Sequence, residues 1–305
     1  MTYNARLSLL VLVAAGLVAN GLPAFAQVFQ ELYSFSGAAD GGGPQGALIQ
    51  GRDGNLYGTT GCGGKWTVGT VFKVTPKGLL TTVASFDGTN GNYPYGALLE
   101  ASDGNFYGAT AYGGAGWNNG VIFKVTPMGE LTRLWSFFTQ GVSPVGDLAQ
   151  GTDGFLYGAC EDGGDYNSHG TIGTIFRIST NGWDLVNLHL FYGDDGLYPS
   201  GGLLLAHDGN FYGVTAGGGL CTGDGTIYRL TTNGTVMTVA SFCQGPGNPA
   251  SPLLTNSRQS EPIRTIRPPP CAPTALGACR AIRSDPYVVS CMSGISGSKF
   301  AITVQ

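Results

Sequence analysis

Short runs of β-branched and aromatic residues, separated by glycine-containing turns, follow one another along the middle of the chain. Within one stretch of about 50 residues these runs cover residues 97–101, 106–111, 121–126 and 131–137. Runs of this length and composition predict β-strands. The turn between the first two contains Asp103-Gly104, and glycine supplies the positive φ that a tight turn requires. The pattern therefore predicts a four-stranded antiparallel sheet.

The same pattern recurs along the chain. One marker, Asp-Gly-x-x-Tyr-Gly, begins at Asp53, Asp103, Asp153 and Asp208. A second marker has a glycine, two further residues, an aromatic residue and then a basic residue. It begins at Gly69, Gly120, Gly173 and Gly225. A period of about 50 residues with four strands in each unit is typical of propeller blades. The sequence thus predicts an all-β fold, a β-propeller of four-stranded antiparallel blades with four recognisable repeats and an incomplete fifth.

The motifs within each unit resemble a known repeat family. Residues 53–60 read Asp-Gly-Asn-Leu-Tyr-Gly-Thr-Thr, residues 69–76 read Gly-Thr-Val-Phe-Lys-Val-Thr-Pro, and Ser-Phe followed by a Pro-x-Gly-x-Leu also recurs. Over roughly residues 31–254 the chain resembles the GloVer (Gloeo_Verruco) tandem repeat of exported bacterial proteins, and it resembles two-component-regulator-type propeller blades more weakly. The GloVer resemblance implies a secreted or surface repeat protein, and it brings no catalytic residues with it.

The order of the strands makes a prediction about ring closure. Residues 29–35 end in Ser34-Phe35, as the fourth strands of three later units end in Ser85-Phe86, Ser136-Phe137 and Ser241-Phe242. A propeller that begins with a fourth strand takes the other three from its C-terminus, which removes free sheet edges. The expected C-terminal partner starts with Pro249, Ser251 and Leu253, but no further Asp-Gly marker follows. An edge left open in this way would allow self-association.

Residues 251–305 differ in composition from the rest of the chain. They carry six basic and two acidic side chains, whereas the whole chain has a net charge of −4. Residues 268–270 are all proline, which cannot join a central strand. We expect residues 27–250 to form the propeller and residues 251–305 an atypical basic tail, either poorly ordered or a degenerate blade. An anchoring tail for an acidic surface and a frame-shifted end both remain open.

The N-terminus has the pattern of a signal peptide. Arg6 precedes an apolar run over residues 7–18, and Ala24-Phe25-Ala26 provides a small-x-small cleavage site. The run is shorter than the roughly 20 apolar residues of a membrane-spanning helix. We expect residues 1–26 to be removed, no membrane span to remain, and the mature protein to be secreted or held at the cell surface or in the periplasm.

The charge limits the classes of binding partner, and the cysteine content limits the possible disulfides. The mild acidity argues against a nucleic-acid partner, which needs a basic surface. Export would allow disulfides, but the cysteines number seven and their spacing does not repeat. The candidate pairs are Cys221 with Cys243 and Cys271 with Cys279; buried free thiols are the alternative.

The long loops are the predicted location of a ligand site. Because strands alternate in direction, the tight turns emerge at one rim, and the second-to-third loops and the links between blades emerge at the other. Exposed rings among short polar side chains suit a carbohydrate or protein ligand, although they would also cover the apolar mouth of the ring. These loops also contain Tyr95. The candidate ligand-binding residues are Trp66, Tyr93, Tyr112, Trp117, Asp162, Asp165, Tyr166, His169 and Tyr198.

Catalytic motifs are scarce. His169, near Asp165, is the one general-base candidate, so a polysaccharide lyase or hydrolase is the alternative to a binding module. The loops at residues 162–165 and 194–196 could hold calcium but lack the regular ligand spacing of known calcium loops, and no other metal or cofactor is expected. We expect an exported binding or surface-interaction module, with a structural self-associating protein as a second alternative. The four in-strand tyrosines Tyr57, Tyr107, Tyr157 and Tyr212 are expected to pack between blades.

Overall fold

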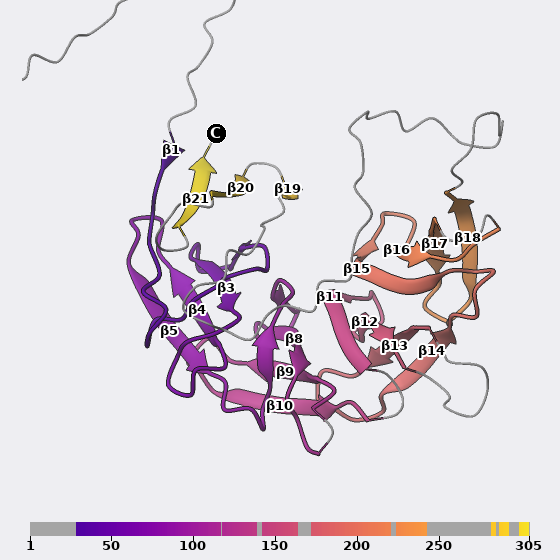
Figure 1. Ribbon diagram of the computed structural model, residues 1–305, viewed down its shortest axis with the longest axis horizontal. Coiled ribbons are helices and arrows are strands. Elements are labelled where there is room, and N and C mark those ends of the chain that lie inside the picture. Colours follow the sequence, from indigo (N-terminus) through magenta and orange to yellow (C-terminus); the bar gives the residue numbers. More distant parts are fainter. Residues whose placement is uncertain are drawn as a thin grey trace, which may run out of the picture.

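The computed structural model describes residues 29–116, 118–138, 142–163, 172–220, 224–242, 282–284, 287–292 and 299–304. Every regular element in these ranges is a β-strand, and the strands form five antiparallel sheets. Figure 1 shows the sheets following one another in an arc around a common centre. The fold is a β-propeller, as the repeat pattern predicts.

The four predicted blades are all present. The first contains β2 (Ile49–Gln50), β3 (Leu56–Thr60), β4 (Thr70–Val74) and β5 (Leu80–Ser85). The second contains β6 (Asn92–Pro94) and β7 (Leu99–Glu100), which both pair with β8 (Phe106–Tyr112), followed by β9 (Val121–Val125) and β10 (Leu131–Ser136). The third contains β11 (Val142–Gln150), β12 (Leu156–Asp162), β13 (Thr174–Ile178) and β14 (Val186–Leu190). The fourth contains β15 (Leu197–Leu205), β16 (Phe211–Gly217), β17 (Thr226–Leu230) and β18 (Val236–Ser241).

The fifth sheet joins the two ends of the described chain. β1 (Phe29–Gln30) pairs with β21 (Lys299–Val304), which pairs with β20 (Tyr287–Met292), which in turn pairs with β19 (Ile282–Ser284). Phe29 lies opposite Thr303, so an N-terminal fourth strand receives its partners from the C-terminal region. Residues 249–254, where the sequence predicts that this blade starts, lie outside the described residues, as does the predicted boundary at residue 251.

Each blade is built by the same local features. The glycine of every Asp-Gly turn has a φ between +78° and +83°, a conformation that side chains rarely adopt. A bulge interrupts the pairing of the third and fourth strands, for example between Val71 and Phe72. After the bulge, the amide of Phe86 donates to the carbonyl of Gly69 over 3.0 Å, and the later blades repeat this bond. The repeated motifs therefore encode turns and strand ends.

Glycine allows the first strands of successive blades to approach closely. A Cβ atom at Gly96 would lie 2.5 Å from the carbonyl oxygen of Gly146, and Gly46 and Gly146 face the next blade in the same way. Likewise, a Cβ at Gly69 would lie 2.8 Å from Cδ of Pro94. Both distances are shorter than real side chains accept, so the Pro-x-Gly-x-Leu motif is the contact surface between neighbouring blades.

The in-strand tyrosines pack between blades, as predicted. Tyr57 of the first blade stacks on Phe106 of the second with ring centroids 4.2 Å apart, and Tyr157 packs on Phe211 at 4.3 Å. Tyr107 lies in one buried cluster with residues of the third blade, including Leu148. The core of the protein therefore lies between the blades. Tyr212, in the last of the four blades, is less buried than the other three.

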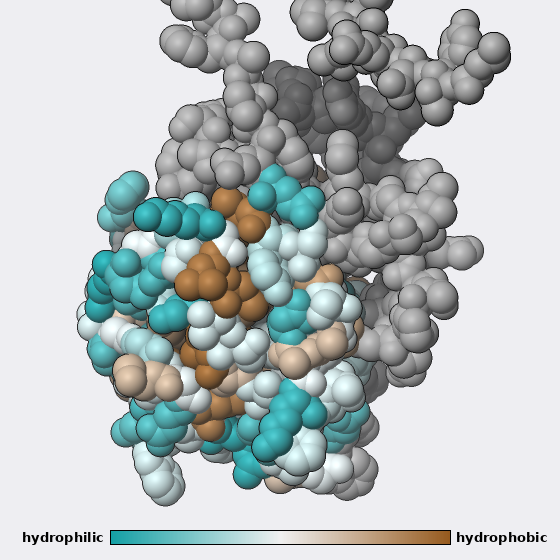
Figure 2. All heavy atoms as spheres, turned by 90° about the vertical axis from the view of Figure 1, so that its left-hand side faces the viewer, coloured by the Kyte–Doolittle hydropathy of each residue, from teal (hydrophilic) through white to brown (hydrophobic). Residues whose placement is uncertain are grey.

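The outer side of the first blade has little exposed apolar surface. Figure 2 shows hydrophobic residues there as a narrow stripe between hydrophilic ones. The outermost strand, β5, is half-buried along most of its length. A stripe of this width is ordinary for a soluble surface and does not by itself indicate an interface.

Candidate functional site

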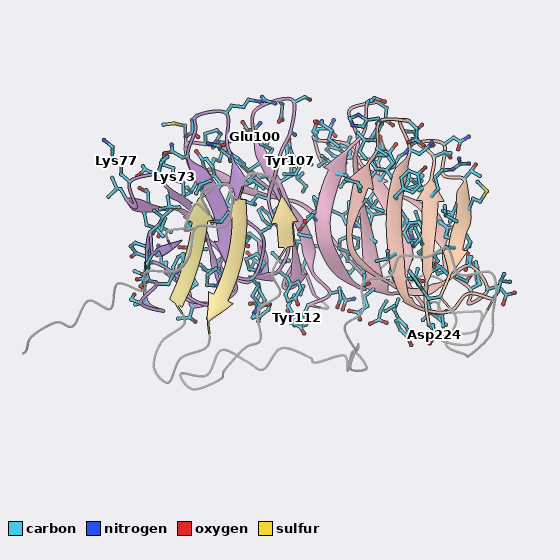
Figure 3. All side chains as sticks on the ribbon, turned by 90° about the horizontal axis from the view of Figure 1, so that it is seen from above. Lys73, Lys77, Glu100, Tyr107, Tyr112 and Asp224 are labelled. Atoms are coloured by element: carbon cyan, nitrogen blue, oxygen red, sulfur yellow. The ribbon has the colours of Figure 1, made fainter. Side chains whose placement is uncertain are left out.

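The two rims of the propeller differ as the strand order predicts. Figure 3 places Lys73, Lys77 and Glu100 at the rim of the tight turns, and Tyr112 and Asp224 at the opposite rim. We call this second side the long-loop rim; it is formed by the connections between second and third strands and by the links between blades.

Three tyrosines meet on the long-loop rim, at the junction of the first and second blades. The ring centroid of Tyr93 lies 6.5 Å from that of Tyr95 and 6.3 Å from that of Tyr112. Tyr95 is 48% exposed, and the other two are half-buried. The side-chain amide of Gln45 donates to the hydroxyl of Tyr93 over 2.5 Å. We call these four residues the tyrosine cluster.

The backbone of the neighbouring blade holds Tyr93 in place. Its φ is +60°, and Ser143 and Tyr198 adopt the same conformation immediately before the proline of their own links. In each case the amide donates to a carbonyl of the preceding blade, at Val68, Asn119 and Ile172 respectively. The ring of Tyr93 rests on Gly61, where a Cβ would lie 3.1 Å from Cε2. The strained conformation is thus explained by contact between blades, and it presents the side chain at the rim.

The other described candidates are Trp66, Tyr198 and Asp162. Trp66 is exposed in the loop after β3, with the ammonium of Lys65 4.9 Å from its ring centroid. Tyr198 is exposed at the junction of the third and fourth blades. Asp162 ends β12 and is exposed; burial, and then the neighbouring charge of Asp162, raises the pKa of Glu161.

Several predicted residues lie outside the described ranges. They are Trp117, Asp165, Tyr166, His169, Cys221, Cys243, Cys271 and Cys279, together with the predicted signal peptide. The general base, the calcium loop at residues 162–165 and the disulfide pairs therefore remain predictions. Within the described part of the chain, Cys160 is a free thiol, no three His, Cys, Asp or Glu side chains are grouped as a metal site would require, and no helix has the length and apolarity to cross a membrane.

Some features of this rim are not predicted by the sequence patterns above. His189 Nε2 lies 2.6 Å from Asp195 Oδ2, and Asp195 also accepts from the amide of Tyr192. Burial raises the pKa of Asp195, but the hydrogen bond from His189 and the others outweigh it and lower that pKa. Phe138 and Tyr192 are exposed rings. Both directly follow the buried phenylalanine that ends a blade, and this position is the signal that could have identified them.

Comparison with family models assigns the repeats. Residues 21–172 and residues 118–260 match the model described as the Gloeobacter/Verrucomicrobia repeat, so the two matches together include all four blades. The chain belongs to the Gloeobacter/Verrucomicrobia repeat family. The resemblance predicted from the motifs is therefore confirmed, and the blade described above is the form that a Gloeobacter/Verrucomicrobia repeat takes in this chain.

Comparison with solved structures gives weaker likenesses. A structure of the nidogen/laminin complex is 17% identical with a TM-score of 0.44, covering 66% of this chain and 65% of that one. A gluconolactonase from Xanthomonas campestris is 12% identical with a TM-score of 0.44, covering 85% of this chain and 71% of that one. A periplasmic gluconolactonase from Pseudomonas aeruginosa is 18% identical with a TM-score of 0.44, covering 65% and 57%. The chain thus spans less than two thirds of the nidogen/laminin chain that it matches. Comparison with curated protein sequences gives no significant match.

Proposed function

We propose that this protein is an exported binding module whose long-loop rim holds a carbohydrate or peptide ligand. The observation that carries the proposal is the tyrosine cluster, in which three aromatic rings and an amide meet at one blade junction. Export is supported by the signal-peptide pattern of residues 1–26.

The chemistry of the cluster suits such a ligand. Flat tyrosine rings stack on sugar faces or on apolar side chains, and their hydroxyl groups form hydrogen bonds at low cost in conformational entropy. The Tyr95 ring is the one most open to solvent, while Tyr93 is positioned by its contact with Gly61. Asn118 and Asn119 are used by the rim itself, because they bond the amide of Gly113 and the carbonyl of Phe138. Polar contacts to a ligand are therefore assigned to Gln45 and the tyrosine hydroxyls.

A binding screen with rim variants tests the proposal. Protein lacking residues 1–26 is screened on a glycan array and a peptide array, and hits are measured by calorimetry. We expect Tyr95→Ala to weaken the binding of a hit about tenfold, as loss of an aromatic anchor does.

Trp183→Ala is the matched control. Trp183 is 72% exposed and follows the tight turn between β13 and β14, on the opposite rim, so its removal should leave affinity unchanged. Equal losses in both variants, or no binding to either array, would contradict the proposal. Release of reducing ends from a bound polysaccharide would favour the enzymatic alternative.

A further inference from the structure

One face of the fourth blade is uncovered where the other blades are packed. In the first three blades, the residues that face the next blade, such as Tyr57, Ile122 and Ile175, are almost fully buried. The matching face of the fourth blade consists of Leu204, Tyr212, Val214, Ile227, Met237 and Val239, and we call it the terminal face. Here Leu204 is 67% and Val214 42% exposed. The alternating burial of β16, against the continuous burial at the start of β3, β8 and β12, records the same difference.

Each formed junction repeats the same contacts to the first strand of the next blade. The glycine just before the third strand of one blade packs on the proline in the first strand of the next blade. Gly120 packs on Pro144 in this way, and a Cβ at Gly120 would lie 2.7 Å from Cδ of Pro144. A glycine of one first strand packs on its counterpart in the next, as Gly96 does on Gly146. The leucine two residues after that first-strand glycine lies in one buried hydrophobic cluster with the in-strand tyrosine of the preceding blade, as Leu203 does with Tyr157.

The same positions of the fourth blade have no such neighbour among the described residues. A Cβ at Gly201 would meet nothing within 4 Å, and the three atoms nearest to one at Gly225 are backbone atoms of its own blade. Phe242 is 45% exposed, although its amide donates to Gly225 over 2.9 Å as its counterparts do. Phe86, its counterpart in the first blade, is fully buried. The fourth blade is therefore complete in its backbone and lacks only the covering of its terminal face.

We propose that residues 249–254 of the same chain dock on the terminal face as a first strand. Pro249, Ser251 and Leu253 repeat the spacing of Pro199, Gly201 and Leu203. The connection also has the right length. At the formed junctions, the link from the end of a fourth strand to the proline of the next blade runs from Ser85 to Pro94, from Ser136 to Pro144 and from Leu190 to Pro199. After β18, the link from Ser241 to Pro249 has a similar length.

The formed junctions assign the partners of this segment. In the proposed docking, Pro249 would pack on Gly225, Ser251 would pass beside Gly201, and Leu253 would join Tyr212 and Ile227. An extended segment with a proline, a small residue and a leucine at alternate positions is the chemistry that this face selects.

The fifth sheet is a poorer fit to the same face. At the other junctions the phenylalanine that ends a blade meets an aromatic ring of the next third strand, as Phe86 meets Phe123 with centroids 4.9 Å apart. Aligning Phe29 of β1 with Leu80 of β5 places Thr303 at the position of Val74 and Ala301 at that of Phe72. The fifth sheet therefore has alanine where a ring is needed to cover Phe242.

Hydrogen exchange on the full mature chain tests the docking. We expect the amides of Ala250, Ser251, Leu253 and Leu254 to be protected, and to exchange about tenfold faster in Val214→Asp, because the carboxylate disrupts the apolar contact. Leu220→Asp is the matched control: Leu220 is 86% exposed in the same blade, and its replacement should leave this exchange unchanged. Exchange in β12 serves as the check that each variant is folded.

A second variant approaches the contact from the other side. Leu253→Asp should accelerate exchange in β16 to a similar extent and add little when combined with Val214→Asp, since both disrupt one contact. Exchange of residues 250–254 at the rate of an unfolded peptide in the unmodified protein would overturn the proposal. Protection that increases with protein concentration would also overturn it, because the segment would then come from a second copy.

Discussion

At the scale of single residues, the Asp-Gly turn connects each hairpin to the interface between blades. Asp103 accepts hydrogen bonds from the amide and side chain of Asn105 and from the hydroxyl of Tyr107. Burial alone raises the pKa of Asp103, but these bonds outweigh it and hold that pKa below its usual value. Burial of the Tyr107 hydroxyl, and then its hydrogen bond to Asp103, raise the pKa of Tyr107. Its hydroxyl also donates to the carbonyl of Thr180 in the next blade, over 3.3 Å.

Replacing this tyrosine measures the value of that connection. Tyr107→Phe keeps the ring but removes both bonds, and we expect it to lower the free energy of unfolding by about 1 to 1.5 kcal/mol. Tyr212→Phe is the matched comparison, since Tyr212 donates to Asp208 over 2.9 Å in a more exposed setting. We expect a smaller loss there. Urea titration of both variants is the measurement, and equal losses would show that the contact with the next blade adds nothing.

At the scale of strands and turns, two glycines of the third blade allow the effect of backbone strain to be distinguished from the effect of close contact between blades. Gly146 has a φ of +76°, and a Cβ added there would collide with the backbone of Gly201. Gly154 has a similar φ of +83°, but a Cβ added there would have no described atom within 4 Å. Both positions strain a side chain, but only the first also separates two blades.

Alanine at these two positions should therefore differ in cost. We expect Gly154→Ala to destabilise the protein by about 1 kcal/mol, from φ alone, and Gly146→Ala by roughly 3 kcal/mol, because the first strands must move apart. Thermal unfolding of the two variants at one pH gives the comparison. If Gly146→Ala cost no more than Gly154→Ala, the contact between first strands would carry little of the stability.

The strands and tight turns are also the level at which the sequence was most informative. The markers at Asp53 and Gly69 recur with their turns and bulges, so the blade follows from local patterns alone. The tyrosine cluster does not, because Gln45 and Tyr93 meet only through the packing of two blades. The pairing of β1 with β21 follows from the sequence only in part: Ser34-Phe35 marks the first segment as a fourth strand, but β21 carries no repeat marker, and Ala301 has no counterpart in the motif.

At the scale of the whole molecule, the two ends of the arc are covered differently. Leu32 and Phe35 pack against the first blade, and the ring of Phe35 meets that of Phe72 with centroids 4.9 Å apart. Phe242 occupies the same place at the other end and is largely exposed. The N-terminal segment therefore covers the third-strand ring of the first blade, whereas no ring among the described residues is known to cover Phe242 at the other end.

This asymmetry predicts unequal effects of one substitution at equivalent sites. We expect Phe35→Ala to lower the free energy of unfolding by roughly 2 to 3 kcal/mol, and Phe242→Ala by at most about 1 kcal/mol, since a partly exposed ring buries less area. Denaturant unfolding followed by tyrosine and tryptophan fluorescence is the measurement. A larger loss for Phe242→Ala would mean that the last ring is covered in solution.

The pairing of Phe29 with Thr303 has a consequence for biosynthesis. The first blade can assemble as soon as residues 49–85 have left the ribosome or the export channel, and each later blade can be added onto its predecessor. The sheet that contains β1 has to wait, because its other strands are translated after those of all four blades. Until then β1 has an unpaired edge, and the newly made chain must be protected from neighbouring copies during that interval.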